Sequence, residues 1–296
     1  MKKLLTISLV IVFCITTLTA QAEWKTIDVP GASYTAAYGI NGGNVVGSCN
    51  KDSIYHGFRY DGSTWTTFDA PGASRTMAMD VYENKIVGWY SEPNGLEHGF
   101  LYNFDSLEWT PINKPGASLT NAFGIDSGNI VGHYVDGSGE HGFKYNLNLQ
   151  AWTTLDKPEA AGTRIYGIDG SNVVGFYEDG SGEHGFTYDG STWTTLDVPV
   201  PGVIGTTACD IYGSNVVGWY QDDSGRQHGF KYNINLQAWT TSPFVDYPGA
   251  NSTAAHGIYG DKIVGLYNDT HGFIVPEPAT IVLLTLGGII LRKSQK

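Results

Sequence analysis

Short apolar stretches alternate with turn-forming residues along most of the chain. Each stretch is rich in β-branched and aromatic residues and is bounded by Gly, Asn, Asp or Pro, as in residues 122–125, 130–134, 141–145 and 152–155. This pattern predicts short β-strands, and no segment shows a useful length of the 3.6-residue periodicity of an amphipathic helix. The region between the two chain ends is therefore expected to be all-β.

The predicted strands recur as a repeat of about 43 residues, four strands to a repeat. His-Gly-Phe occurs six times, with spacings of 42, 43, 43, 44 and 43 residues. A strand that begins with Trp also occurs six times, at Trp24, Trp65, Trp109, Trp152, Trp193 and Trp239. Four antiparallel strands in a repeat of this length are typical of one propeller blade. Residues 23–275 thus predict a six-bladed β-propeller.

The repeats are offset by one strand from the ends of this region. Residues 24–27 form a lone fourth strand, whereas residues 271–274 form a third strand with no Trp strand after it. We expect the N-terminal strand to complete the last blade, because this arrangement closes the ring and leaves fewer exposed strand edges.

The N-terminus has the order of a secretory signal peptide. Lys2 and Lys3 precede an apolar run over residues 4–18, and Ala20-Gln21-Ala22 supplies the small residues that signal peptidase requires. Residues 1–22 are expected to be removed on export, and the alternative is an N-terminal membrane anchor.

The C-terminus combines Pro276-Glu277-Pro278, an apolar stretch over residues 279–291 and a basic end with Arg292, Lys293 and Lys296. Thirteen apolar residues are fewer than the ~20 that a helix needs to cross a bilayer. Residues 276–296 resemble the PEP-CTERM sorting signal of Gram-negative bacteria, which implies a short hydrophobic helix in the membrane, exosortase as a processing partner and an association with exopolysaccharide and biofilm. The alternative is a plain C-terminal membrane anchor through residues 279–291.

The repeat itself resembles the HAF family of extracellular repeats over residues 24–275. The matching elements are Gly-Ile, Val-Val-Gly and His-Gly-Phe, where that family often has His-Ala-Phe. The resemblance implies the same fold and an extracellular location, in the cell envelope, at the outer surface or in the matrix, and it assigns no activity.

Charge narrows the range of partners. The chain has 17 basic and 29 acidic residues, a net charge of −12, and the predicted propeller without the two end segments is more acidic still. Such a body repels nucleic acid and anionic lipid. Outside the signal peptide the chain has two cysteines, Cys49 and Cys209, and both are expected to be free and buried.

Residues present in every blade are expected to stabilise the blade. A hydrogen bond from each His-Gly-Phe imidazole to a neighbouring strand or turn would lock its hairpin, which concerns His56, His98, His141, His184, His228 and His271. No cofactor is predicted, although carboxylates in two Asp-Gly-Ser-Gly-Glu loops leave calcium open as an alternative to ordinary turns. These carboxylates belong to Asp136, Glu140, Asp179 and Glu183.

Residues that differ between blades are the stronger candidates for a single site. The first strand of each blade should line the central channel, where Asp80 and Asp210 replace a Gly and where His256 and Arg164 are unique nearby. These four residues are the candidates for catalysis. Aromatic side chains that could stack on a sugar, or pack between blades, are Tyr38, Phe123, Tyr166, Trp89 and Trp219.

Two functions remain from the sequence. The first is a non-catalytic surface or matrix protein that binds a glycan or a protein. The second is an extracellular polysaccharide hydrolase or lyase with a site at the channel mouth. The regular spacing of the Trp strands leaves no room for the long loops of propeller enzymes, which favours the first.

Overall fold

The computed structural model describes residues 13–19, 23–240, 245–276 and 280–286. It divides into two units, Trp24–Val275 and a small unit formed by both chain ends. In the small unit, β1 (Phe13–Thr19) pairs with β26 (Thr280–Leu286) in antiparallel register. The predicted short helix after Pro278 is therefore wrong over Thr280–Leu286, where four of seven residues are β-branched and favour a strand. No helix in the described part of the chain has the length and apolar character needed to span a membrane.

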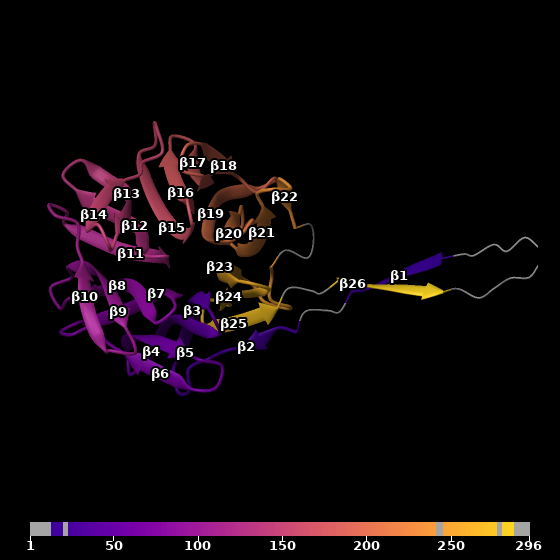
Figure 1. The fold of residues 1–296 in the computed structure, drawn as a ribbon, viewed down its shortest axis with the longest axis horizontal. Coiled ribbons are helices and arrows are strands. Elements are labelled where there is room, and N and C mark those ends of the chain that lie inside the picture. Colours follow the sequence, from indigo (N-terminus) through magenta and orange to yellow (C-terminus); the bar gives the residue numbers. More distant parts are fainter. Residues whose placement is uncertain (1–12, 20–22, 241–244, 277–279, 287–296) are drawn as a thin grey trace, which may run out of the picture. The chain divides into compact units, whose positions relative to one another are not determined.

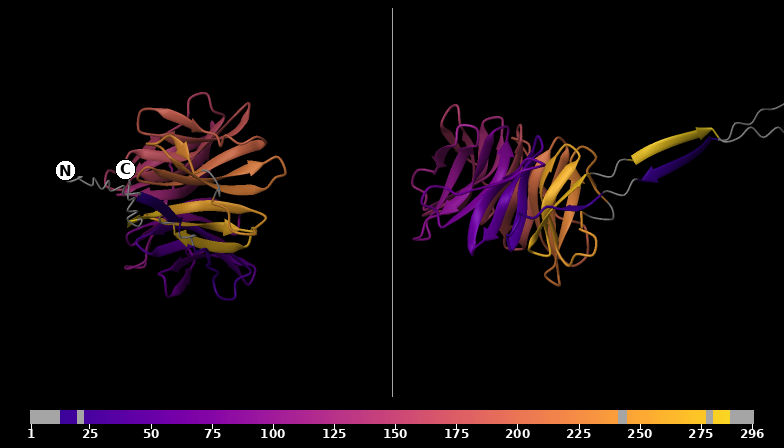
Figure 2. Two further views of the ribbon diagram at one scale, coloured as in Figure 1. Left: turned by 90° about the vertical axis from the view of Figure 1, so that its right-hand side faces the viewer. Right: turned by 90° about the horizontal axis from the view of Figure 1, so that it is seen from below.

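The described part of the large unit contains sheets of eight, twelve and four strands, in which antiparallel groups of four strands are joined side by side through single parallel bridges (Figure 1 and Figure 2). The innermost strands are β3 (Tyr34–Asn41), β7 (Arg75–Tyr82), β11 (Leu119–Asp126), β15 (Gly162–Asp169), β19 (Val203–Tyr212) and β23 (Thr253–Tyr259). The second strands are β4 (Asn44–Lys51), β8 (Lys85–Ser91), β12 (Asn129–Asp136), β16 (Asn172–Asp179), β20 (Asn215–Asp222) and β24 (Lys262–Tyr267). The third strands are β5 (Ile54–Tyr60), β9 (Glu97–Asn103), β13 (Gly139–Asn146), β17 (Gly182–Tyr188), β21 (Gln227–Asn233) and β25 (His271–Pro276). The outermost strands are β6 (Trp65–Phe68), β10 (Glu108–Ile112), β14 (Ala151–Thr154), β18 (Trp193–Leu196), β22 (Ala238–Trp239) and, in the last sheet, β2 (Lys25–Thr26).

The innermost strands contact one another in sequence around a ring, and β23 contacts β3. Figure 1 shows these groups of strands arranged around a common centre, so the expected all-β propeller is confirmed. Each group of four strands is called a blade below, and the blades are numbered one to six from β3 onward.

The core of every blade is the phenylalanine of His-Gly-Phe. These six rings are 0–1% exposed, and each contacts the tryptophan of the outermost strand at a ring-centroid distance of 4.7–5.2 Å. The glycine of the second strand gives the ring its space: a Cβ at Gly218 would lie 2.1 Å from the Thr207 carbonyl oxygen and 2.7 Å from the Phe230 ring. The repeated motifs are thus packing elements of the blade.

The N-terminal strand completes the last blade, as the offset of the repeats predicts. Lys25 pairs with Ile274 and Thr26 with Phe273, and the Ile27 amide donates to the Gly272 carbonyl oxygen at 2.8 Å. Trp24 lies 5.1 Å from the Phe273 ring and takes the place of the missing blade tryptophan. Strands from the two ends of the large unit therefore belong to one sheet.

Candidate functional site

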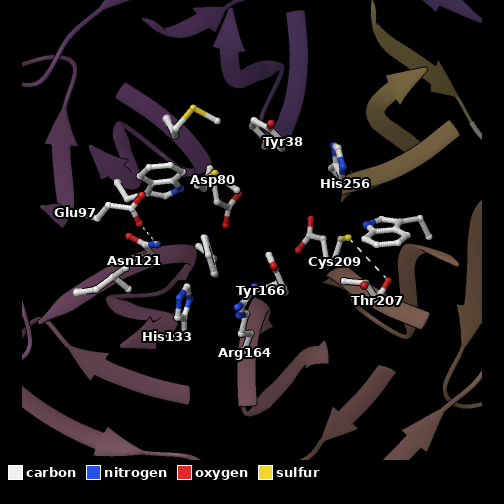
Figure 3. Close-up of a pocket in the computed structure, with 17 residues that line it drawn as sticks. Tyr38, Asp80, Glu97, Asn121, His133, Arg164, Tyr166, Thr207, Cys209 and His256 are labelled. Carbon is white, nitrogen blue, oxygen red and sulfur yellow. Dashed lines mark hydrogen bonds between the residues drawn. The ribbon is translucent and has the colours of Figure 1, made fainter. Parts of the chain in front are cut away.

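Every innermost strand has a β-bulge at the same place, and this bulge forms the channel lining. The register shifts at Tyr38, Met79, Phe123, Tyr166, Cys209 and His256. A bulge inserts one residue without a partner and redirects its side chain. Figure 3 shows Tyr38, Tyr166, Cys209 and His256 around the channel.

The structure brings all nine predicted channel candidates together. They line one cavity of about 470 Å³, a volume in the range of small-molecule pockets. Those nine are Tyr38, Asp80, Trp89, Phe123, Arg164, Tyr166, Asp210, Trp219 and His256. A second cavity of about 370 Å³ lies further along the same strands, and the two linings share only Asp80 and Asp210. These two carboxyl groups therefore stand where the two halves of the channel meet.

Asp80 and Asp210 join neighbouring innermost strands. The two Oδ atoms of Asp80 accept hydrogen bonds from the amides of Val81 and Ile125, at 2.7 and 2.9 Å. Asp210 accepts in the same way from Ile211 and Ile258, at 2.8 Å each. Because each oxygen already holds a backbone N–H, the geometry favours a link between blades over a general acid and base.

Both carboxyl groups have raised pKa values. Burial raises the pKa of Asp80 to about 7, against the lowering effect of its two backbone hydrogen bonds. Burial and then repulsion from Asp80 raise the pKa of Asp210 well above its ordinary value. The pair therefore tends to hold protons at pH values where exposed aspartates have lost them.

One side of the cavity is crossed by polar contacts between successive blades. A Glu on the third strand of one blade accepts a hydrogen bond from the innermost strand of the next. Glu97 accepts from Asn121 Nδ2 at 3.0 Å, and Glu183 accepts from Thr207 Oγ1 at 2.5 Å. Glu140 binds Arg164 through Nε and through Nη2, the latter at 3.1 Å. Two of the calcium candidates, Glu140 and Glu183, are thus engaged within the protein.

The other two calcium candidates hold their own loops. Asp136 and Asp179 each accept hydrogen bonds from the amide and hydroxyl of the Ser two residues later, at 2.6–2.8 Å. These contacts lower the pKa of both carboxyl groups. In the described part of the chain, no group of three or more His, Cys, Asp or Glu side chains is placed to hold a metal ion.

Four of the five aromatic candidates contact another ring or a guanidinium group. Phe123 and Tyr166 are nearly parallel, 4.6 Å apart at 9°, and Tyr38 lies 5.0 Å from His256. The Arg75 guanidinium lies 4.5 Å from the Trp89 ring. Such contacts fix ring orientation, so these four side chains form a preorganised wall.

Three further residues, which the repeat pattern does not single out, also shape the cavity. Glu97, Asn121 and His133 all line it, and His133 is 6% exposed. Burial, with a smaller effect of the Arg164 charge, lowers the pKa of His133 to about 3, so the imidazole is neutral. The sequence contains a signal for Asn121. In the blade before it, an acidic residue, Glu97, directly precedes the repeated His. Met77 and Ala254 occupy the position of Asn121 in two other blades, and the blades before them have Tyr55 and Gln227 instead of an acid.

The six repeated histidines lie outside this cavity lining. Five of them bond an Asp through Nδ1 at 2.8–3.0 Å, and that Asp follows the outermost strand of the same blade. The fifth pair, His271 with Asp28, connects the third strand of the last blade to the N-terminal segment. His98 differs, because Asn113 stands where the other blades have Asp, and its Nε2 lies 3.4 Å from Glu92.

Because His98 lacks the Asp partner, it serves as a control for the stabilising effect of the His–Asp contacts. A double-mutant cycle of His184→Ala and Asp197→Ala should give a coupling free energy of about 1 kcal/mol at pH 7.5 by urea unfolding. The matched cycle of His98→Ala and Asn113→Ala should give a value near zero. Equal coupling in both cycles would contradict a stabilising His–Asp contact.

Cys49 and Cys209 are buried and form no disulfide, as expected. Of the sorting residues, Pro276 ends β25, whereas Glu277 and Pro278 lie outside the described residues. The same is true of Ala20-Gln21-Ala22 and most of residues 1–22.

Comparison with known proteins gives the fold only. No family model and no curated protein matches the chain. TolB from Acinetobacter baumannii is 11% identical with a TM-score of 0.56, over 81% of this chain and 65% of TolB, so this chain spans slightly less than two thirds of that protein. AofleA from Arthrobotrys oligospora is 11% identical with a TM-score of 0.51, over 90% of each chain. The β-propeller domain of the Trilobed protease from Pyrococcus furiosus, with an open velcro topology, is 11% identical with a TM-score of 0.51, over 85% of this chain and 86% of that one. At such identities the likeness concerns architecture, and the architecture that this chain shares with them is the β-propeller.

Proposed function

We propose that this chain is an exported, non-catalytic binding protein of the cell surface or the extracellular matrix. Its ligand, a glycan or a segment of another protein, enters the cavity of about 470 Å³ in the channel. One observation carries the proposal: the residues that distinguish the blades from one another meet in a single cavity. The residues that pack the interior of a blade recur in every blade, as the phenylalanine of His-Gly-Phe does.

Export rests on the two chain ends. The order of charge, apolar run and small residues over residues 1–22 supports processing by signal peptidase. The order Pro276-Glu277-Pro278, apolar stretch and basic end supports sorting by an exosortase, with residues 279–291 holding the chain at the membrane before or instead of cleavage.

The contacts around the catalytic candidates favour binding over hydrolysis. Asp80 and Asp210 have both oxygens occupied by backbone amides, and Arg164 is held by Glu140. His256 Nδ1 donates to the Ala37 carbonyl oxygen at 3.2 Å, and burial lowers its pKa to about 4. Each candidate thus has a partner that fixes it in the wall. A polysaccharide hydrolase or lyase would need at least one of them free to exchange a proton with substrate.

The proposal is tested by a glycan array and a protein-binding screen on the purified full chain, with and without calcium. We expect binding that falls at least tenfold in the Trp89→Ala/Trp219→Ala variant, because aromatic stacking supplies ~1–3 kcal/mol to a ligand contact. Tyr212→Ala is the matched control, since Tyr212 is an exposed aromatic residue of the second cavity. Ligands that bind both variants equally well would place the binding site elsewhere, and release of sugar fragments would favour the enzyme.

A further inference from the structure

Two buried hydrogen-bond acceptors in the cavity wall have no partner. Asn121 on β11 and His133 on β12 are directly paired in register, and they are 5% and 6% exposed. Asn121 Oδ1 and His133 Nδ1 make no hydrogen bond with any described residue. An unsatisfied buried polar atom costs ~1–3 kcal/mol, so two on adjacent side chains of one cavity indicate a ligand that satisfies them.

Each of these two side chains has a second polar atom, and the partner of that atom shows that Asn121 Oδ1 and His133 Nδ1 are acceptors. Asn121 Nδ2 donates to Glu97 at 3.0 Å, which leaves Oδ1 as the free atom of the amide. His133 Nε2 lies 3.2 Å from Glu140 Oε1. A carboxylate accepts, so Nε2 carries the proton and Nδ1 of the neutral ring keeps its lone pair. The ligand must therefore present hydrogen-bond donors.

The charges around these atoms exclude an anionic ligand. Glu97 and Glu140 are the immediate partners of Asn121 and His133. The two nearby cations are already engaged, since Arg75 lies 3.6 Å from Glu97 and Arg164 is bonded to Glu140. A carboxylate or sulfate at this wall would therefore meet hydrogen-bond acceptors and like charges.

The rest of the lining is aromatic. The stacked Phe123 and Tyr166 rings adjoin this wall, and Phe123 lies 5.1 Å from the His133 ring. Trp89 and Trp219 line the same cavity, and Figure 3 shows His133, Asn121 and Tyr166 on one side of it. A sugar ring has an apolar C–H face that suits aromatic side chains and hydroxyl groups that donate.

We infer that the cavity binds an uncharged sugar residue whose hydroxyl groups donate to Asn121 Oδ1 and His133 Nδ1. The inference rests on the proposed binding function and names the chemistry of its ligand. Both residues line the cavity, and neither acceptor atom is held by another hydrogen bond.

The test compares neutral and acidic oligosaccharides on the full chain by isothermal titration calorimetry. The probes are tetrasaccharides of glucose, galactose or mannose and the tetrasaccharides of the matching uronic acids. We expect at least one neutral probe to bind ten times more tightly than its uronate counterpart. Asn121→Leu and His133→Phe should each weaken that binding at least tenfold. His133→Gln should lose less, because its amide can donate to Glu140 and still offer an acceptor.

Asn129→Leu is the matched control. Asn129 lies on the same sheet and bonds Asn146 at 2.9 Å, away from the cavity, so its loss should leave affinity unchanged. Thermal melting of each variant separates lost binding from lost folding. Three results would overturn the inference: tighter binding of a uronate, full affinity in both Asn121→Leu and His133→Phe, or binding of peptides alone. If the uronates or peptides then fail to bind the Trp89→Ala/Trp219→Ala variant, the proposed function is still upheld. Unchanged binding of every ligand in the Trp variant would instead overturn the proposed function.

Discussion

Removing residues 24–30 should destabilise the propeller more than replacing the tryptophan of another blade with alanine does. The deletion removes β2 and exposes the backbone of β25. It also removes Ile27 and Val29, which are 3% and 5% exposed and belong to a core cluster with Phe58 of the first blade. Burial of two such side chains contributes ~1.5–3 kcal/mol each, so with Trp24 the loss should exceed ~5 kcal/mol. That is comparable to the whole stability of many domains.

The matched control is Trp65→Ala, because Trp65 has the same role in a blade whose outermost strand follows directly along the chain. It should cost ~3–5 kcal/mol. Urea unfolding followed by tryptophan fluorescence measures both. A deletion variant as stable as Trp65→Ala would mean that the last blade is stable without its N-terminal strand, as in a propeller of open topology.

The parts of the fold that repeat could be predicted from the sequence, because six copies of one pattern reinforce a single interpretation. Phe58 and its five counterparts, the tryptophan strands and the offset of the ends all follow from repeat phase. Only Lys25–Thr26 and Ala238–Trp239 are shorter than expected among the outermost strands. The channel residues could also be found, because the residue before Gly or Asp in each first strand falls on the bulge.

Contacts between blades were harder to predict. Whether Glu140 meets a cation or a side chain depends on how the third strand of one blade lies against the first strand of the next. One parallel bridge joins Glu140 to Gly162 and brings Arg164 within reach of Glu140. The pattern of strands within a single blade does not reveal this placement. The free acceptors of Asn121 and His133 depend on the same placement.

The Asp80–Asp210 pair should make the propeller less stable as the pH rises from about 4 to about 7. An unfolded Asp has a pKa of 3.8, and the folded Asp80 has a pKa of about 7. Between these values the folded state binds more protons than the unfolded state, so the free energy of unfolding falls with rising pH. Above about pH 7 the folded pair loses its protons and the decline ends for Asp80.

Buried histidines oppose this trend, so the total pH profile does not isolate the pair. His133 and His256 have pKa values of about 3 and about 4 in the folded state, both lowered mainly by burial. The unfolded state binds their protons more tightly, and their contribution to stability therefore grows with pH up to about 6.5. His228 has a raised pKa, and its contribution falls as the pH rises.

The Asp80→Gly/Asp210→Gly variant isolates the pair, since four other blades carry Gly at this position. It loses the hydrogen bonds to Ile125 and Ile258 at every pH, which is a constant cost. The histidine contributions remain in both proteins and largely cancel in the difference. In urea unfolding, the free energy of unfolding of the variant, relative to that of wild type, should therefore rise by ~2–4 kcal/mol between pH 4.5 and pH 7.5. Asp61→Ala gives a control without a slope, because hydrogen bonds from Thr64 and Ser63 lower the Asp61 pKa to about 2 and the carboxyl group is ionised in both states above pH 4.5, so its stability difference from wild type should stay constant over this range. A stability difference that stays constant across this pH range would show that the two carboxyl groups are ionised in the folded channel, and that their negative charge is offset by a bound cation or by water rather than by protons.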